Sequence, residues 1–449
     1  MANGLLEVNP EGPHPIFQLI HGAEAAWSHK LRRASTNFPQ VVEEYRRRYK
    51  RAPPRGFEDW WNYVQKHAVH LPDEYDQIQA DLEPFWGIEP TDLLALRAEL
   101  EAKVDSVVNT SFEAGKYGQL IRGSEDIIDL LGDVEEFLPP FRAVFSPHDA
   151  PNRLSDYVFS SSANISRKKF PGTDPKGWIS APGSPARNRS IDLDGMPPPK
   201  TTRKTFIHDH SLAMDPCLHP DHFFRRGQFL SDEKGHAPQR EMVPEFAYCS
   251  SRIHHNIRIP TPGTTGSTNG CCGAGAAPHT AQTRGRRSHR VNLLRITNHL
   301  QGTLPILSPF KSPTEPVGES TQMRKARLNP GMMDAGAPSC AIRGRTSICR
   351  GCSRGGGTRA CRRHGPTNLQ VDGNGWSGRF KRLATSSSLF GTRFIDRIAH
   401  WVHYIPIQLD LSDLHDALVF FRGDASGAGA HEVLAPGRKT NGMCRLILK

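Results

Sequence analysis

The residue types best suited to chemistry gather in the stretch 371–390, VDGNGWSGRFKRLATSSSLF. Its closely spaced glycines allow the backbone to turn tightly and to approach a ligand. The serine and arginines that follow fall in the first turns of a predicted helix, where free backbone N–H groups and the helix dipole favour an anion. The residues that would hold this anion are Gly373, Gly375, Ser377, Arg379 and Arg382. The stretch predicts a phosphate-binding turn, and the alternative is an ordinary strand–turn–helix with solvated arginines.

A second candidate for chemistry is Asp149, in the stretch FRAVFSPHDAPN at 141–152. An apolar strand pattern runs through Phe145 and breaks at Pro147, so Asp149 falls on the loop that follows. In open α/β sheets, ligands bind just beyond the carboxyl ends of strands. Asp149 is therefore a candidate functional carboxylate, and the alternative is a turn aspartate close to a proline.

Histidines and aspartates are concentrated in a third stretch, FIHDHSLAMDPCLHPDHFF at 206–224. Metal binding is one interpretation of this stretch. The spacing matches no regular ligand pattern, so we predict no metal site there. The side chains concerned are His208, His210, Asp215, His219, Asp221 and His222.

The nine cysteines support two further hypotheses. Cys217 and Cys249 stand apart from the others, and we predict a disulfide between them if the protein folds in an oxidising compartment. The segment CRGCSRGGGTRACRRH contains CxxC and CxxH pairs that resemble zinc ligands and an RGG-like run that could bind RNA. No apolar residues lie between the pairs to pack a zinc module, so nucleic-acid binding through this segment remains an alternative.

Hydrophobic spacing predicts the elements that would position these residues. A strand is predicted to precede the glycine turn, and Trp376, Phe380 and Leu383 give the following helix an apolar face. The stretch 401–424 predicts a strand followed by a helix that begins near Ser412.

The N-terminal third is predicted to be mostly helical. Residues 15–70 have helical apolar spacing that is interrupted at Pro53 and Pro54, and further amphipathic helices are predicted over 91–112 and 124–137. We interpret the basic stretch YRRRYKRAPPRGFEDWW as a solvated helix packed by aromatic residues, followed by a second helix.

The overall charge favours an anionic partner. The chain has 449 residues, a formal net charge of +11 and a pI of about 9.3, which suit a nucleotide, a nucleic acid or a membrane surface. Its length allows two domains. No apolar run approaches the roughly 18 residues of a membrane span, and the first residues lack the order of a signal peptide. We therefore expect a soluble chain with no membrane span.

Taken together, these stretches resemble glycosyltransferase family 90, the capsule-associated glycosyltransferases that include the protein O-glucosyltransferases. The matching pieces occur in the family's order between about residues 14 and 433. They are YRRRYKRAPPRGFEDWW, FSPHDAPN, DPKGW with PGSPAR, MDPCLHPDH, AYCSSRIHHNI, MRKARLNPGMMD, VDGNGWSGRFKRL and WVHYIPIQLDLSDLHDALVFFRGD.

The resemblance implies transfer of xylose or glucose from a UDP-sugar donor to a glycan or protein acceptor, with inversion and without a metal or other cofactor. It implies that Asp149 is the catalytic base, that Ser377 and Arg379 hold the donor diphosphate, and that Arg382 assists. It also implies a Golgi or secretory lumen, although no signal peptide or anchor is visible, and no nucleic-acid partner is expected. A catalytically inactive remnant of the family is the alternative.

Two acid-free stretches depart from the family's pattern. Where the family has a W-R-G-S motif that helps to hold the diphosphate, this chain has GTTGSTNGCCGAGAAPHTA. Codons read from the third base of the Gly270 codon permit L-L-W-R-G-S-S-T-A, so another reading frame can encode the expected motif. We therefore hypothesise that residues near 263–282 and part of 336–368 are frame-shifted or mis-spliced translation, and that the family's C-terminal helix is missing after Pro436.

The predicted fold class is α/β, with two Rossmann-like lobes of the glycosyltransferase B type, a helical N-terminal region, and poorly ordered segments near 260–305 and 336–368. The predicted organisation is a tail (1–13), a helical N-terminal region (14–140), an acceptor-side lobe (141–259), an aberrant or disordered segment (260–305), the start of the donor-side lobe (306–335), an aberrant Arg/Gly/Cys-rich segment (336–368), a donor lobe that binds the UDP-sugar (369–434) and an aberrant tail (435–449).

Overall fold

The computed structural model describes about half of the chain. The described residues are 2–102, 108–113, 116–117, 141–146, 151, 153, 203–225, 243–247, 249–251, 253–259, 292–293, 295–296, 299–308, 313–332, 368–371, 396–422 and 445–448. Within them, helices and strands are mixed and the sheets are small. An α/β fold class is consistent with this composition.

Helices account for most of the N-terminal part. They are α1 (Pro15–Arg33), α2 (Phe38–Tyr49), α3 (Phe57–Lys66), α4 (Asp76–Leu82), the 3₁₀ helix η1 (Glu83–Gly87) and α5 (Pro90–Ala102). Later helical segments are α9 (His210–Ala213), the 3₁₀ helix η4 (Pro220–Phe224), α12 (Lys325–Met332) and α14 (Leu414–Arg422).

The described strands are short. They are β1 (Leu5–Glu7), β2 (Val108–Glu113), β3 (Lys116–Tyr117), β4 (Phe141–Phe145), β5 (Thr205–Ile207), β6 (Glu245–Ala247), β7 (Ile257–Arg258), β8 (Thr303–Ile306), β9 (Thr321–Arg324), β10 (Asn368–Val371), β11 (Ile405–Ile407) and β12 (Arg445–Leu448).

Local signals explain where the first helices begin and end. The Asn37 side chain accepts a hydrogen bond from the Gln40 N–H and caps α2, which ends at Lys50 in the left-handed conformation before the prolines. These helices confirm the helical prediction for 15–70. The prediction of a helix over 91–112 is confirmed by α5 as far as Ala102 and is wrong over 108–112, because residues 108–113 form β2. Pairing of β2 with β4 supplies hydrogen bonds that local helix propensity does not anticipate. The helix predicted over 124–137 lies outside the described residues.

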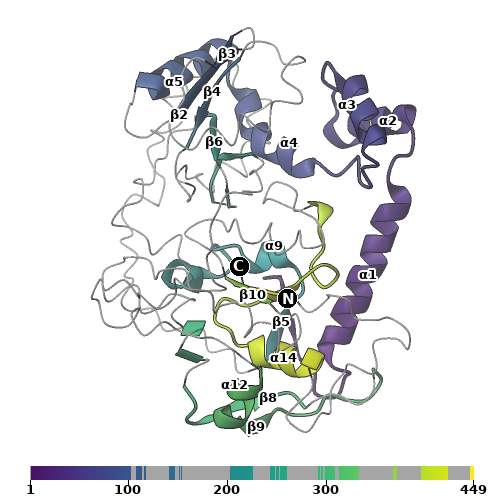
Figure 1. Ribbon diagram of the computed structural model, residues 1–449, viewed down its shortest axis with the longest axis vertical. Coiled ribbons are helices and arrows are strands. Elements are labelled where there is room, and N and C mark those ends of the chain that lie inside the picture. The colour runs from purple at the N-terminus through teal and green to yellow at the C-terminus, as the bar shows by residue number, and fades with distance from the viewer. Residues whose placement is uncertain are drawn as a thin grey trace, which may run out of the picture.

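One sheet has the order β3-β2-β4-β6-β7. The pairs β4–β6 and β6–β7 are parallel, whereas β2 pairs antiparallel with both β3 and β4. The strand predicted through Phe145 is confirmed as β4, in which Ala143, Val144 and Phe145 are buried. Figure 1 shows this sheet in the upper half of the molecule, next to α5.

Another sheet, in which both strand pairs are parallel, has the order β10-β12-β11. The strand and helix predicted over 401–424 are confirmed as β11 and α14, and Leu414 and Leu418 of α14 are buried. The segment 435–449, which we set apart as an aberrant tail, contributes the central strand β12 of this sheet. The strand β8 falls at the end of the segment 260–305, which we predicted to be aberrant or disordered, and Leu293 and Ile296 of the same segment pack against the main core.

The main core joins α1, α14, β5 and β11. Ile16 and Leu19 of α1 pack in one cluster with Phe206, Ile407 and Phe420. Figure 1 shows α1 running along one side of the molecule, from α14 at its lower end to α2 and α3 at its upper end. Helix α1 therefore connects the core of the lower half to the N-terminal helices.

Two cysteines are described, Cys217 and Cys249, and the structure does not join them in a disulfide. Cys217 is exposed after α9, whereas Cys249 is buried after β6. The predicted Cys217–Cys249 disulfide is therefore not formed, because the two residues follow elements of different sheets and differ in exposure.

No helix among the described residues is long and apolar enough to cross a membrane.

The buried imidazole of His14 makes folding sensitive to acid. His14 accepts a hydrogen bond from the Ile16 N–H at the start of α1 and lies against the rings of Phe206 and Phe420. Burial, together with the charge of Lys204, lowers the His14 pKa from 6.5 to about 3. As the pH falls below 6.5, the unfolded chain takes up a proton at His14 that the folded protein does not. The free energy of unfolding therefore falls by up to about 1.4 kcal/mol per pH unit.

We expect His14→Asn, which keeps an acceptor for the helix N-terminus, to weaken this acid sensitivity. In urea unfolding at pH 7 and pH 5, the loss of stability on acidification should be about 2 kcal/mol smaller than in the parent protein. His21→Asn, at an exposed position of the same helix, is the matched control. Equal pH dependence in His14→Asn and the parent protein would contradict the assignment.

Candidate functional site

Asp149 and the residues of the glycine turn lie outside the described residues, but the strands that precede them are described. Asp149 follows the end of β4, and the glycine turn with Gly373, Gly375, Ser377, Arg379 and Arg382 follows the end of β10. Both strands take part in parallel pairing, β4 with β6 and β10 with β12. The two candidate stretches therefore follow the carboxyl ends of strands in two different sheets.

Both sides of the Asp149 loop are attached to β6. On the side before the loop, the Ser146 N–H donates to the Phe246 carbonyl oxygen, at 2.7 Å. On the side after it, the Arg153 guanidinium donates from Nε to Glu245 Oε2, at 2.8 Å. Ser146 and Arg153, on the two sides of the loop, are therefore both anchored to one strand.

The Arg153 anchor is fully enclosed. Arg153 is 1% exposed and Glu245 is 0% exposed. Asn256 links the two, since its side-chain oxygen accepts from the Arg153 N–H at 3.0 Å and its Nδ2 donates to Glu245 Oε2 at 3.1 Å. The His255 N–H donates to the Arg153 carbonyl oxygen, at 2.9 Å. A buried ion pair is stable only with such additional hydrogen bonds, so this network fixes Arg153 beside Glu245.

The N-terminal helices enclose a pocket of about 340 Å³. Its walls are mainly aromatic and its rim carries charged side chains. The lining residues are Val41, Glu44, Tyr45, Arg48, Tyr49, Pro54, Arg55, Gly56, Phe57, Trp60, Pro72, Asp73, Tyr75, Ile78 and Gln79. A concave site with apolar walls and a few oriented polar groups is the usual form of a small-molecule site.

Aromatic contacts build the walls of this pocket. The Phe57 and Trp60 rings stack with centroids 4.7 Å apart, and the Tyr45 ring meets Phe57 edge-on at 5.3 Å. Trp60 also meets the Tyr75 ring edge-on, at 5.8 Å. The basic aromatic stretch predicted to be a solvated helix is therefore one wall of a cavity.

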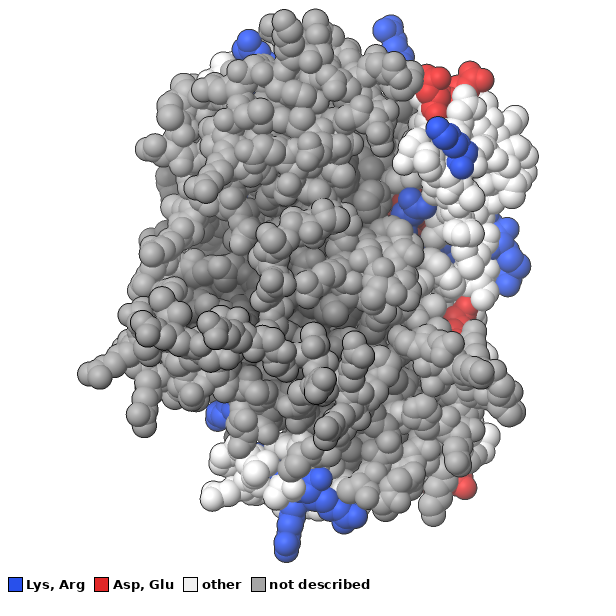
Figure 2. Space-filling view, viewed as in Figure 1, with Lys and Arg blue, Asp and Glu red and all other residues white. Residues whose placement is uncertain are grey.

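Arg48, at the rim of the pocket, is paired with carboxylates. Arg48 contacts Glu44, Glu74 and Asp76, at 2.6, 2.9 and 3.2 Å. Hydrogen bonds from Arg47 and from Arg48 lower the pKa of Glu44 to about 2. Figure 2 shows basic and acidic side chains interspersed over the described residues of this face. Within the basic stretch, the charges of Arg47 and Arg48 are thus balanced by neighbouring carboxylates.

Asp396 and Arg397, which precede β11 in the chain, form hydrogen bonds with residues near the pocket. The Asp396 carboxylate accepts from the Gln77 N–H at 3.0 Å, and its carbonyl oxygen accepts from Lys30 Nζ at 2.7 Å. Arg397 donates to the Tyr75 hydroxyl at 3.1 Å and lies over its ring. Residues far apart in the chain therefore support one wall of the pocket.

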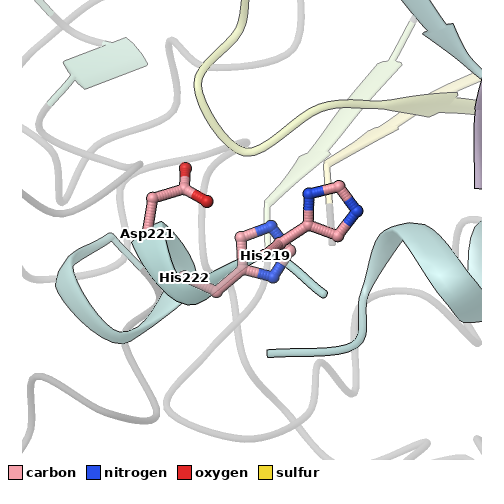
Figure 3. Close-up of side chains that lie close together, drawn as sticks. All are labelled: His219, Asp221 and His222. Atoms are coloured by element: carbon pink, nitrogen blue, oxygen red, sulfur yellow. The ribbon is translucent and has the colours of Figure 1, made fainter. Parts of the chain in front are cut away.

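The histidine-rich stretch separates into structural residues and one cluster. His210 contacts the Tyr404 hydroxyl through Nδ1 at 2.5 Å, and Asp215 accepts from the Cys217 N–H at 2.9 Å. The cluster is formed by His219, Asp221 and His222, each of which places a ligand-type atom within 4.8 Å of the others. Figure 3 shows the two imidazoles beside one another, with the carboxylate on the same side of η4.

Comparison of the chain with protein-family models, with curated proteins and with solved structures finds no match.

Sequence reasoning missed two of these features. The Arg153 network joins residues that are 92 and 103 positions apart, and the sequence gives no signal for these pairings. The pocket did have a signal, because Tyr45, Tyr49, Phe57 and Trp60 cluster in the sequence around an interrupting pair of prolines.

Proposed function

We propose that the chain is a glycosyltransferase that moves xylose or glucose from a UDP-sugar to a hydroxyl group of a glycan or protein acceptor, with inversion and without a metal ion. The observation that carries the proposal is the relation of the two motif stretches to the parallel strands. Asp149 and the glycine turn each follow a strand that pairs in parallel, and they do so in separate sheets. Ligands bind beyond the carboxyl ends of such strands. Two Rossmann-like lobes with the donor between them would have this organisation.

In the proposed reaction the acceptor oxygen attacks the anomeric carbon of the donor sugar. Asp149 takes the proton of the attacking hydroxyl group as the new C–O bond forms. The bond between the anomeric carbon and the β-phosphate oxygen breaks, and UDP leaves with the electron pair. Ser377, Arg379 and the N–H groups after Gly375 stabilise the charge that develops on the β-phosphate, while Arg382 adds positive charge nearby.

The aromatic pocket supports a carbohydrate acceptor. Trp60, Tyr45 and Phe57 offer apolar ring faces, and tyrosine hydroxyls and carboxylates lie beside them. This combination suits a ligand with an apolar body and several hydroxyl groups.

The proposal is tested by measuring UDP release from UDP-xylose and UDP-glucose with and without a glycan acceptor. We expect acceptor-dependent release with one of the two donors, and a product of inverted anomeric configuration. A folded protein that releases no UDP from either donor would instead be an inactive remnant.

A further inference from the structure

We propose that His219, Asp221 and His222 form a binding site for a divalent transition-metal ion of the zinc class. The three side chains come from one turn of chain around η4, and their ligand-type atoms lie within 4.8 Å of one another. Two imidazoles and one carboxylate with an open fourth position match a common zinc ligand set. The proposal is independent of the glycosyltransferase reaction, which uses no metal ion.

The hydrogen bond of His219 prepares its ring for a metal ion. Its Nε2 lies 2.8 Å from the carbonyl oxygen of Asn3, which can only accept a hydrogen bond. Nε2 must therefore carry the proton, and the neutral ring keeps a lone pair on Nδ1. Metal-binding histidines commonly donate their outer N–H to a backbone carbonyl in this way, which fixes the ring orientation.

The carbonyl group of Asn3 is itself held in place. The next residue, Gly4, accepts hydrogen bonds through its carbonyl oxygen from the N–H groups of His208 and Asp209, at 2.9 and 3.0 Å. Gly4 has a φ of +80°, and a Cβ there would lie 2.6 Å from the Ala213 nitrogen, so only glycine fits. The outer partner of the site is thus a fixed part of the turn before β1.

The positions of His222 and Asp221 are determined by contacts with neighbouring side chains. His222 is 5% exposed, and its ring stacks on that of His219 with centroids 5.2 Å apart. Asp221 contacts Arg225 through Oδ2 at 3.2 Å, and a carboxylate can retain this contact on one oxygen while the other meets a metal ion.

The test is a titration of the full chain with Co²⁺ and with Zn²⁺ after chelator treatment and alkylation of its thiols, which removes cysteine ligands from competition. We expect one equivalent of Co²⁺ to bind with visible d–d absorption and without a sulfur-to-cobalt charge-transfer band. Zn²⁺ should displace it and raise the melting temperature.

Variants separate this site from adventitious binding. His219→Gln and Asp221→Asn should each weaken Zn²⁺ binding by more than about 100-fold, since loss of even an outer-shell partner costs about 10–100-fold. His29→Gln, at an exposed histidine on α1, is the matched control and should bind as the parent protein does. Equal affinity of the parent protein and both cluster variants, or no binding by the alkylated parent protein, would overturn the proposal.

Discussion

Replacing Asp149 by Asn is expected to lower the rate of sugar transfer by about 10²–10⁴-fold while leaving UDP binding unchanged. The amide has nearly the same size as the carboxylate but cannot take the proton of the acceptor hydroxyl group. The strand β4 and the buried Arg153 fix the two sides of the loop, so its geometry should survive the substitution. The measurement is the initial rate of UDP release, together with the dissociation constant of UDP.

Asp209→Asn is a suitable control for this experiment. Asp209 caps α9 by accepting from the Leu212 N–H, and asparagine caps helices about equally well. Transfer at the parent rate by Asp149→Asn would exclude Asp149 as the base. Loss of both transfer and UDP binding would point to a structural role for Asp149.

The second large effect is expected for Arg153→Met. Removing the guanidinium leaves the fully buried Glu245 carboxylate without its ion-pair partner. The expected loss in the free energy of unfolding is about 3–5 kcal/mol, measured by urea denaturation. Since this is a large fraction of the roughly 5–15 kcal/mol that stabilises a domain, the melting temperature should fall markedly as well.

Two further variants test whether the loss of stability comes from breaking the buried ion pair or from losing a positive charge in general. Arg203 pairs with Glu7 at 2.8 Å, but its side chain is 74% exposed, so Arg203→Met should change stability by less than about 1 kcal/mol. The double variant Arg153→Met/Glu245→Gln should recover part of the stability that the single variant loses, because no unpaired charge remains buried. Equal losses for Arg153→Met and Arg203→Met would contradict the account.

The sequence predicts the local parts of the fold best. Helices α1 to α3 follow from apolar spacing and from the prolines at 53 and 54. The β11–α14 pair follows from its apolar strand and the polar start of its helix. In these cases, the residues that determine the structure lie within a few positions of one another.

Long-range pairing accounts for most of what the sequence does not predict. The strand β2 forms because residues 108–112 pair with 141–145, and β12 forms the centre of a sheet whose other strands come much earlier in the chain. The cluster of His219, Asp221 and His222 does not have the spacing of a regular metal-ligand motif. Its members come together because they lie on the 3₁₀ turn of η4. Local sequence patterns do not predict the two strand pairings, because the paired residues are far apart in the chain.

The proposed donor residues and Asp149 remain predictions from sequence motifs. Their support is positional, since each stretch follows a described strand with a parallel partner. The reading-frame hypothesis for 263–282 and 336–368 concerns residues outside the described part of the chain, and sequencing the transcript across both segments tests it.

The most direct test of the central claim, that this chain holds a UDP diphosphate at its glycine turn, is thermal unfolding with and without UDP. At a UDP concentration of about 100 times its dissociation constant, the account predicts an increase of roughly 2.7 kcal/mol in the free energy of unfolding. The increase should be lost in Arg379→Ala. A melting temperature that is unchanged by UDP at millimolar concentration would contradict the claim.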